Sequence, residues 1–308
     1  EAAPVTAFDV SRDTGRLAYV SGGDLIVADA DGGNRGVVLA SATIDPSVYH
    51  AADLTITNPL WAPGGETIAF SLGGVQLVPA SGGEPSMLLA NEPPTIDIAP
   101  FSVMYQPALW SPDGSKLLLN YAFYPEGGGL AALDMVERSV VRADASKGIT
   151  CCEPVWSPDG GAYYYAFDTA AITRAGLWAA DSDTGAETTI LGSDAAEGPW
   201  VMARAPLALA DGSLRAFVGL TDDLDVIFGS EPRTLQLASV NPLTGDVTPL
   251  RSDSINLLSA LWAPDGSGAV VTSAPYAEGD MALAWLPAAD LPLASLPLAG
   301  RSPRWGAR

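Results

Sequence analysis

The residue types that could catalyse a reaction are scarce in this sequence. His50 is its one histidine, in the segment Val48-Tyr-His-Ala51. A Ser-His-Asp or Cys-His mechanism would have to use that imidazole, and the chain has no Gly-x-Ser-x-Gly nucleophile elbow. Zinc sites built from several histidines cannot be assembled. A glycosidase needs only two carboxylates at a defined separation, which a sequence does not give. We therefore expect a non-enzymatic chain, with a hydrolase as the alternative.

Three neighbouring carboxylates are the best candidates for binding a cation. Asp222, Asp223 and Asp225 crowd one short segment, and their charges repel one another unless water or a metal ion separates them. Another segment, Asp29-Ala-Asp-Gly-Gly-Asn34, starts like a calcium loop but has the wrong glycine spacing and lacks the terminal Glu, so it is interpreted as a hairpin turn. Calcium at the three aspartates and a solvated acidic loop remain the two interpretations, and no other cofactor is predicted.

The two cysteines, Cys151 and Cys152, are adjacent. They could form a strained vicinal disulfide or remain thiols, and a disulfide there would close no long loop. The two cysteines therefore do not indicate whether the protein works in an oxidising or a reducing compartment.

Composition excludes further classes of function. The 308 residues include 15 basic and 36 acidic side chains, a net charge of −21, so phosphate backbones would be repelled and nucleic acid is excluded as a partner. Apolar residues never run for the roughly 18 positions that cross a bilayer, so no transmembrane segment is predicted. The first residue is Glu1, which fits a processed chain with a signal peptide or lipid anchor upstream, and equally a shortened one.

A repeat organises the whole chain. Four copies of a Trp-Ser/Ala-Pro motif followed by Asp-Gly or Gly-Gly each precede an apolar strand, and two degenerate copies fill the gaps. The anchor residues recur about every 50 residues, a period typical of propeller blades. They are Val10, Trp61, Trp110, Trp156, Ala208 and Trp262. Each unit also contains two further strands joined by a turn signal such as Asp181-Ser-Asp-Thr-Gly185, which predicts four-stranded antiparallel blades.

These motifs resemble the TolB-type, WD-like β-propeller repeats over nearly the whole chain. The resemblance implies an all-β, six-bladed propeller in a single domain, 1–308. It also implies an extracytoplasmic location and a role as a docking or binding platform. Pro303-Arg-Trp305 looks like another inner strand. We expect it to close the propeller against the N-terminal segment, and a truncated seventh blade is the alternative.

Strand order predicts two different faces. If the inner strands run toward the Pro-Asp-Gly turns, those turns and the hairpins between third and fourth strands share one face, here called the turn face. Loops between second and third strands and the connections between blades share the opposite, irregular face, where function is expected.

Acidic and aromatic side chains of the irregular face could bind a basic protein surface, a sugar or a cation, although such aromatics also commonly pack against a neighbouring blade. The candidates are Tyr49, His50, Phe101, Tyr105, Tyr124, Asp222, Asp223, Asp225, Phe228 and Tyr276. Asn58, Gln106 and Glu153 precede inner-strand prolines and are expected to face the central channel.

The leading hypothesis is an extracytoplasmic propeller that docks other proteins, as an accessory subunit of an envelope complex. The alternative is a small-ligand or carbohydrate binder, including a hydrolase, with its site at the channel mouth. A calcium-stabilised structural module is the third possibility.

Overall fold

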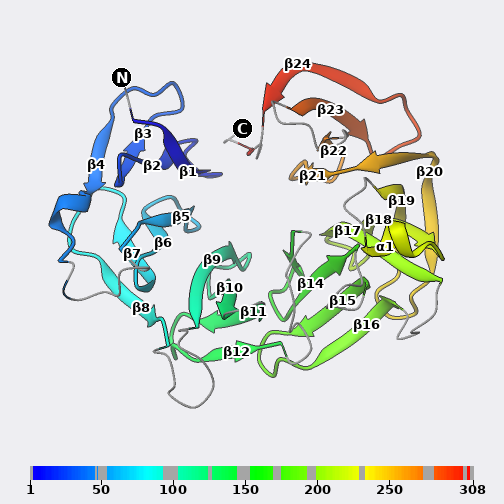
Figure 1. The fold of residues 1–308 in the computed structure, drawn as a ribbon, viewed down its shortest axis with the longest axis horizontal. Coiled ribbons are helices and arrows are strands. Elements are labelled where there is room, and N and C mark those ends of the chain that lie inside the picture. Colours follow the sequence, from blue (N-terminus) through cyan, green and yellow to red (C-terminus); the bar gives the residue numbers. More distant parts are fainter. Residues whose placement is uncertain are drawn as a thin grey trace. The chain divides into compact units, whose positions relative to one another are not determined.

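Six four-stranded antiparallel sheets make up the described part of the chain, so the fold is an all-β six-bladed propeller, as the sequence predicts (Figure 1). The computed structural model describes residues 3–45, 47, 54–92, 103–123, 127–143, 153–168, 175–192, 199–228, 233–272, 281–300 and 304–305. The chain divides into two compact units, residues 1–142 with 304–308 and residues 143–303.

The first unit contains three blades, coloured blue to green in Figure 1. Their strands are β1 (Val5–Val10), β2 (Leu17–Ser21), β3 (Asp24–Ala28) and β4 (Gly36–Leu39); β5 (Thr57–Trp61), β6 (Thr67–Ser71), β7 (Gly74–Pro79) and β8 (Ser86–Ala90); and β9 (Met104–Trp110), β10 (Lys116–Phe123), β11 (Gly127–Asp134) and β12 (Val140–Arg142). A 3-10 turn, η1 (Ser41–Thr43), follows the first blade.

The second unit contains the other three blades. Their strands are β13 (Val155–Trp156), β14 (Ala162–Phe167), β15 (Gly176–Asp181) and β16 (Glu187–Gly192); β17 (Trp200–Ala208), β18 (Leu214–Thr221), β19 (Arg233–Val240) and β20 (Val247–Leu257); and β21 (Ser259–Trp262), β22 (Gly268–Thr272), β23 (Met281–Pro287) and β24 (Ala294–Gly300). A short helix, α1 (Leu224–Phe228), lies between β18 and β19. Each anchor residue of the repeat is the last residue of an inner strand.

The Ser-Pro-Asp-Gly turn is held by its own side chains. In the third blade, Ser111 is buried and its hydroxyl accepts the N–H of Lys116 at 2.9 Å while donating to Asp113 Oδ1 at 2.8 Å. Gly114 adopts a φ of 72°, which glycine takes without a steric cost. Because hydroxyl and carboxylate satisfy the turn internally, inner and second strands are joined by a short, rigid connection.

Two tryptophans of the repeat, Trp61 and Trp262, fill seams between blades of the same unit. Trp61 lies in a core cluster that contains Ala18 and Leu25 of the first blade as well as Ile68 of its own blade. Trp262 packs its ring 5.6 Å from the ring of Phe217 in the preceding blade. The large aromatic surface therefore joins successive sheets, as expected for a side chain of this size.

Inner strands are bent next to their prolines. Asn58, Glu153 and Ala205 each precede a proline and have positive φ values of 49°, 49° and 45°, which is uncommon for residues with a Cβ. The strand pairing shifts around Asn58 and Ala205, the pattern of a β-bulge. The carbonyl of Ala205 accepts the indole N–H of Trp262 at 2.7 Å. Here the bent backbone supplies an acceptor to the tryptophan of the next blade.

Near the C-terminus, Arg304 and Trp305 are described outside any strand, whereas Pro303 lies outside the described residues. The guanidinium of Arg304 lies 5.8 Å from the ring of Phe8, and its Nε is 3.9 Å from Asp9 Oδ1. Asp9 Oδ2 accepts the backbone N–H of Trp61 at 2.8 Å. Burial raises the pKa of Asp9 despite these contacts. Arg304 thus lies against β1 within the first unit.

The indole hydrogen bond can be tested by comparing two tryptophans. Trp262→Phe leaves the carbonyl of Ala205 without its donor, whereas the buried Nε1 of Trp110 has no hydrogen-bond partner among the described residues. We expect Trp262→Phe to lower the free energy of unfolding by about 1 kcal/mol more than Trp110→Phe. Urea unfolding of both variants measures the difference, and equal losses would show that the bond contributes nothing.

The pH dependence of stability tests the buried carboxyl. A pKa raised in the folded state means that the stability contribution of Asp9 is present below the unfolded value of 3.8 and is lost as pH rises through the folded value. Asp9→Asn keeps an acceptor for Trp61 but cannot ionise. Its stability relative to the wild type should therefore increase between pH 4 and pH 7 in urea titrations.

Asp113→Asn is the matched control, because hydrogen bonds from Ser115 and Ser111 lower the pKa of this exposed carboxyl to about 2. Its stability relative to the wild type should fall slightly just above pH 4, as the unfolded carboxyl finishes ionising, and then stay constant to pH 7. The absence of any increase for Asp9→Asn would contradict the account of Asp9.

Candidate binding surfaces

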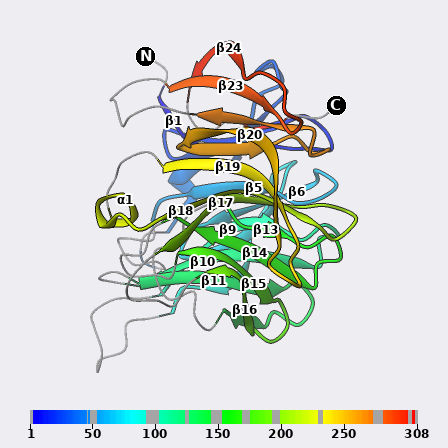
Figure 2. The same cartoon turned by 90° about the vertical axis from the view of Figure 1, so that its right-hand side faces the viewer.

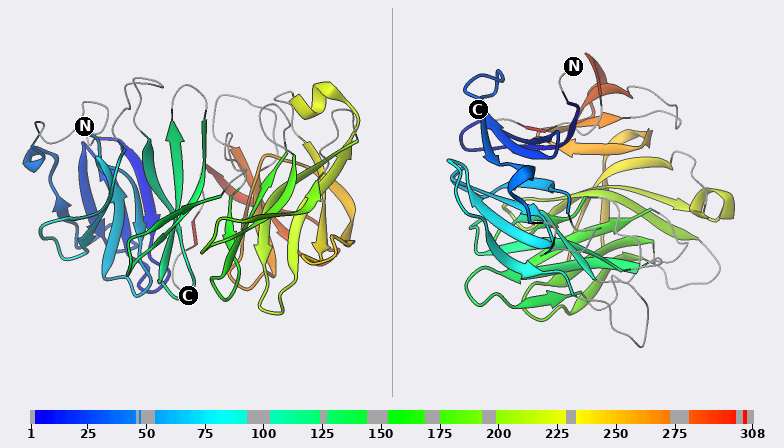
Figure 3. Two further views of the ribbon diagram at one scale, coloured as in Figure 1. Left: turned by 90° about the horizontal axis from the view of Figure 1, so that it is seen from below. Right: turned by 60° about the vertical axis from the view of Figure 1, so that its left-hand side comes forward.

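The irregular face of the second unit is marked by α1. Figure 3 shows α1 at one end of the strands of this unit and short hairpin turns at the opposite end. Figure 2 shows the helix standing out to one side, beyond β18. Several predicted residues lie outside the described residues or have side chains that do: Tyr49, His50, Phe101, Tyr124, Cys151, Cys152, Phe228 and Tyr276.

The predicted acidic segment surrounds the start of α1. Asp223 Oδ1 accepts the N–H of Asp225 at 2.9 Å, and its carbonyl accepts that of Ile227 at 3.1 Å, so Asp223 initiates the helix. Asp222, Asp223 and Asp225 are exposed, and the side chain of Leu220 just before them is 69% exposed. Exposed acidic and apolar side chains are therefore neighbours along this segment of the chain.

No three His, Cys, Asp or Glu side chains in the described part of the chain are grouped closely enough to hold a metal ion. The three aspartates are therefore not gathered around a cation position, and calcium binding there would require them to move together.

Tyr105, another predicted contact residue, is 2% exposed at the start of β9. Its hydroxyl donates to Glu92 Oε1 at 2.5 Å, and Arg142 donates to both groups. The guanidinium of Arg142 lies 5.5 Å and 5.0 Å from the ring centroids of Tyr105 and Tyr121. Burial and the bond to Glu92 raise the pKa of Tyr105 to about 12, so the phenol stays protonated at neutral pH. Tyr105 therefore belongs to the packing of the first unit.

The predicted channel residues fall in both units. Asn58 in β5 and Gln106 in β9 are half-buried in the first unit, and Gln106 pairs across the sheet with Asn120. Glu153 is exposed and belongs to the second unit. Their role at a channel stays a prediction.

A buried ion cluster in the second unit was not predicted from the sequence. Asp168, the residue after β14, is 4% exposed, and its Oδ2 lies 3.4 Å from Arg204 Nε and 3.8 Å from Arg233 Nε. Arg233 is the first residue of β19 and is also buried. Charged side chains that are largely shielded from water therefore connect the fourth and fifth blades. Removing one of them would leave its partners without a counter-ion.

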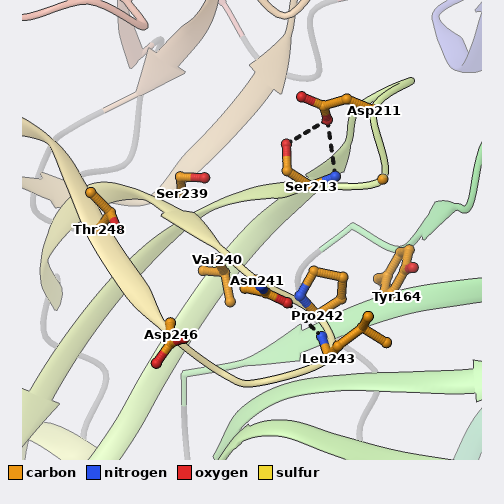
Figure 4. Close-up of a pocket in the computed structure, with 11 residues that line it drawn as sticks. Tyr164, Asp211, Ser213, Ser239, Val240, Asn241, Pro242, Leu243, Asp246 and Thr248 are labelled. Atoms are coloured by element: carbon orange, nitrogen blue, oxygen red, sulfur yellow. Dashed lines mark hydrogen bonds between the residues drawn. The ribbon is translucent and has the colours of Figure 1, made fainter.

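A groove on the turn face of the second unit, with a volume of about 660 Å³, was also not predicted. One wall is the turn 209–213 between β17 and β18, and the other is the hairpin 241–246 between β19 and β20. Tyr164 of β14 contributes from the neighbouring blade (Figure 4). The side chain of Leu243 at the hairpin tip is 94% exposed.

The sequence contained one signal for this groove. The hairpin Asn241-Pro-Leu-Thr-Gly245 carries a leucine where the matching hairpin of the fourth blade, Asp181-Ser-Asp-Thr-Gly185, carries an aspartate. The leucine therefore places an apolar side chain at the tip of the turn that forms one wall of the groove. Because the turns of this face are short and similar in sequence, we expected the functional residues on the opposite face.

Comparisons with known proteins place the fold. No protein-family model matches the sequence, and the comparison with curated protein sequences gave no match. Among solved structures, TolB from Acinetobacter baumannii is 18% identical with a TM-score of 0.52, covering 100% of this chain and 66% of that chain. This chain therefore spans just under two thirds of the length of that TolB.

Enzyme structures are similar as well. An oligogalacturonate lyase in complex with manganese is 13% identical with a TM-score of 0.56, covering 92% of this chain and 82% of that chain. A prolyl endopeptidase is 13% identical with a TM-score of 0.57, covering 97% of this chain and 44% of that chain. At these identities the likeness shows the fold alone, and the same fold carries several functions.

The buried ion cluster yields a stability prediction. Asp168→Asn leaves two guanidinium groups, one of them buried, without the carboxylate between them, so it should lower the free energy of unfolding by about 3 kcal/mol. Arg204→Met retains the pair of Asp168 with Arg233 and should cost less. Urea unfolding measures the free energy of unfolding of both variants. An unfolding midpoint of Asp168→Asn equal to that of the wild type would refute a stabilising role of the cluster.

Proposed function

We propose that this TolB-type β-propeller is a non-enzymatic protein-docking platform that works outside the cytoplasm as an accessory subunit of an envelope complex. The observation that carries the proposal is the open acidic and apolar surface at the start of α1. There Leu220 lies next to the exposed carboxylates Asp222, Asp223 and Asp225.

This surface has the properties of a protein contact. Its carboxylates complement a basic partner and speed the encounter, while the exposed leucine offers apolar area to bury. The net charge of −21 extends the same attraction around the molecule. The surface rests on β18 and β19, whose eight-residue strands provide a rigid base for it.

Within the described ranges no helix is long and apolar enough to span a membrane. The repeat resemblance supports docking and an extracytoplasmic location. The enzymes among the similar structures show that the fold also accommodates catalysis, so the docking role needs its own test.

Charge reversal provides that test. The tagged protein is cross-linked and purified from its native source, and the proteins that co-purify with it in stoichiometric amounts, its companions, are identified. The triple variant Asp222→Lys, Asp223→Lys, Asp225→Lys should lose these companions. The matched control is Glu66→Lys, Glu84→Lys, Glu137→Lys, which changes the net charge equally at exposed carboxylates of the first unit. We expect the control to retain the companions.

Two outcomes would overturn the proposal. One is that the wild-type protein is recovered without any companion. The other is that both triple variants lose companions equally, because a general effect of net charge would then explain the loss.

A further inference from the structure

We propose that the groove on the turn face of the second unit is a second docking site, for a basic, extended segment of a partner protein. It is separate from the acidic surface at α1, since the hairpin turns lie at the opposite end of the strands (Figure 3). This inference extends the proposed function and can fail independently of it.

The walls of the groove are preformed. In the hairpin, Asn241 donates its N–H to the carbonyl of Asp246 at 2.9 Å, and Gly245 donates to the carbonyl of Asn241 at 2.9 Å. Gly245 has a φ of 73°, and a Cβ there would lie 2.7 Å from the carbonyl oxygen of Ile190 in β16. The hairpin is thus packed directly on the fourth blade. A ligand would meet a fixed surface, which lowers the entropy lost on binding.

The charge of the groove is negative. Asp211 Oδ1 accepts bonds from the hydroxyl of Ser213 at 2.6 Å and from its N–H at 3.0 Å, and these bonds lower the pKa of Asp211 (Figure 4). Asp211 Oδ2 accepts no hydrogen bond from a described residue. On the other wall, Asp246 Oδ2 accepts a hydrogen bond from the hydroxyl of Thr244 at 2.7 Å. Asp246 Oδ1 accepts no hydrogen bond from a described residue. Each wall therefore presents one carboxylate oxygen to a ligand.

Among the described residues that line the groove, none is a lysine, arginine or histidine. Arg215 lies close enough to lower the pKa of Asp211 further, but its Nη1 donates to the carbonyl of Gly266. The two carboxylates are therefore left to attract a cation from another molecule.

The rest of the lining is suited to a long side chain. Tyr164 is half-buried, and its hydroxyl makes no hydrogen bond to a described residue. Burial and the charge of Asp159 raise its pKa, so it presents a neutral phenol. Leu243, 94% exposed, is the apolar group at the hairpin tip. A bare metal ion would use neither residue.

Lysine or arginine side chains of a partner segment match these groups. Their charges would pair with Asp211 on one wall or Asp246 on the other, and their aliphatic stems would contact Tyr164 and Leu243. The volume of about 660 Å³ accommodates a few side chains of an extended segment. The net charge of −21 favours the approach of such a segment.

Peptide binding tests the site directly. The probe is a fluorescein-labelled peptide of alternating Lys and Leu, measured by fluorescence anisotropy with the full chain. Peptides of the same length with Glu in place of Lys, or Ser in place of Leu, are the ligand controls. We expect the Lys-Leu peptide to bind most tightly and the Glu-Leu peptide not to bind. Added salt should weaken the interaction.

Variants locate the binding. Asp211→Asn with Asp246→Asn keeps the turn acceptors but removes both charges, and should raise Kd about three- to tenfold, as expected for two exposed ion pairs. Leu243→Ser should raise it similarly. The matched control is Asp113→Asn with Glu137→Gln, which removes two carboxylates from the corresponding turns of the third blade, and should leave Kd unchanged. Melting temperatures confirm that each variant folds.

Two results would overturn this inference: no binding of the Lys-Leu peptide, or equal affinity for the wild type and the Asp211→Asn, Asp246→Asn variant. In either case the proposed function stands if native companions are retained by the wild type and lost from the triple variant at α1. Conversely, groove binding of the peptide without native companions would leave the groove site intact and remove the proposed docking role.

Discussion

The packing of a large side chain at the end of an inner strand against the preceding blade is the constraint on which the structure depends. Trp61 and Trp262 show it most clearly, because each belongs to a core shared by two sheets. A four-stranded blade has two faces to cover, and a flat aromatic covers much of both neighbours at once. The bulge at Ala205 serves this packing, since its carbonyl accepts a hydrogen bond from the indole N–H of Trp262. Turns and loops outside the seams are then free to differ between blades.

The two units show what that freedom permits. Where a loop must stay in place, its polar groups are paired within the fold, as in the Arg142 contact with Tyr105 and Glu92, or the carboxylate of Asp168 between two arginines. Where pairing is incomplete, acidic and apolar groups meet at the surface, as at α1 and along the 241–246 hairpin. The excess of acidic side chains makes such surfaces complementary to basic partners.

The fold could be predicted because its determinants are local and repeated. The apolar strands expected after the repeat motif are present, as at Thr67–Ser71 and Gly268–Thr272. Even the degenerate anchors Val10 and Ala208 end inner strands. Side-chain environments were harder to predict. Tyr105 was expected as a contact residue, yet an arginine 37 positions later in the chain stacks on it.

The groove and the ion cluster depend on which residues of different strands become neighbours. Asp211 and Asp246 line one groove only because β17 to β20 form one sheet, and Tyr164 joins the lining from another blade. A sequence shows none of these distances. The exposed leucine at position 243 was the one local signal, and it was hidden among turns that otherwise look alike.

The account is tested most directly by amide hydrogen exchange of the native assembly, compared with the isolated chain. It predicts slower exchange in the assembly at residues 220–227, where the acidic surface would be covered, and at 241–246 if a basic segment fills the groove. Unchanged exchange at both segments, in a preparation that contains a stoichiometric companion, would contradict it.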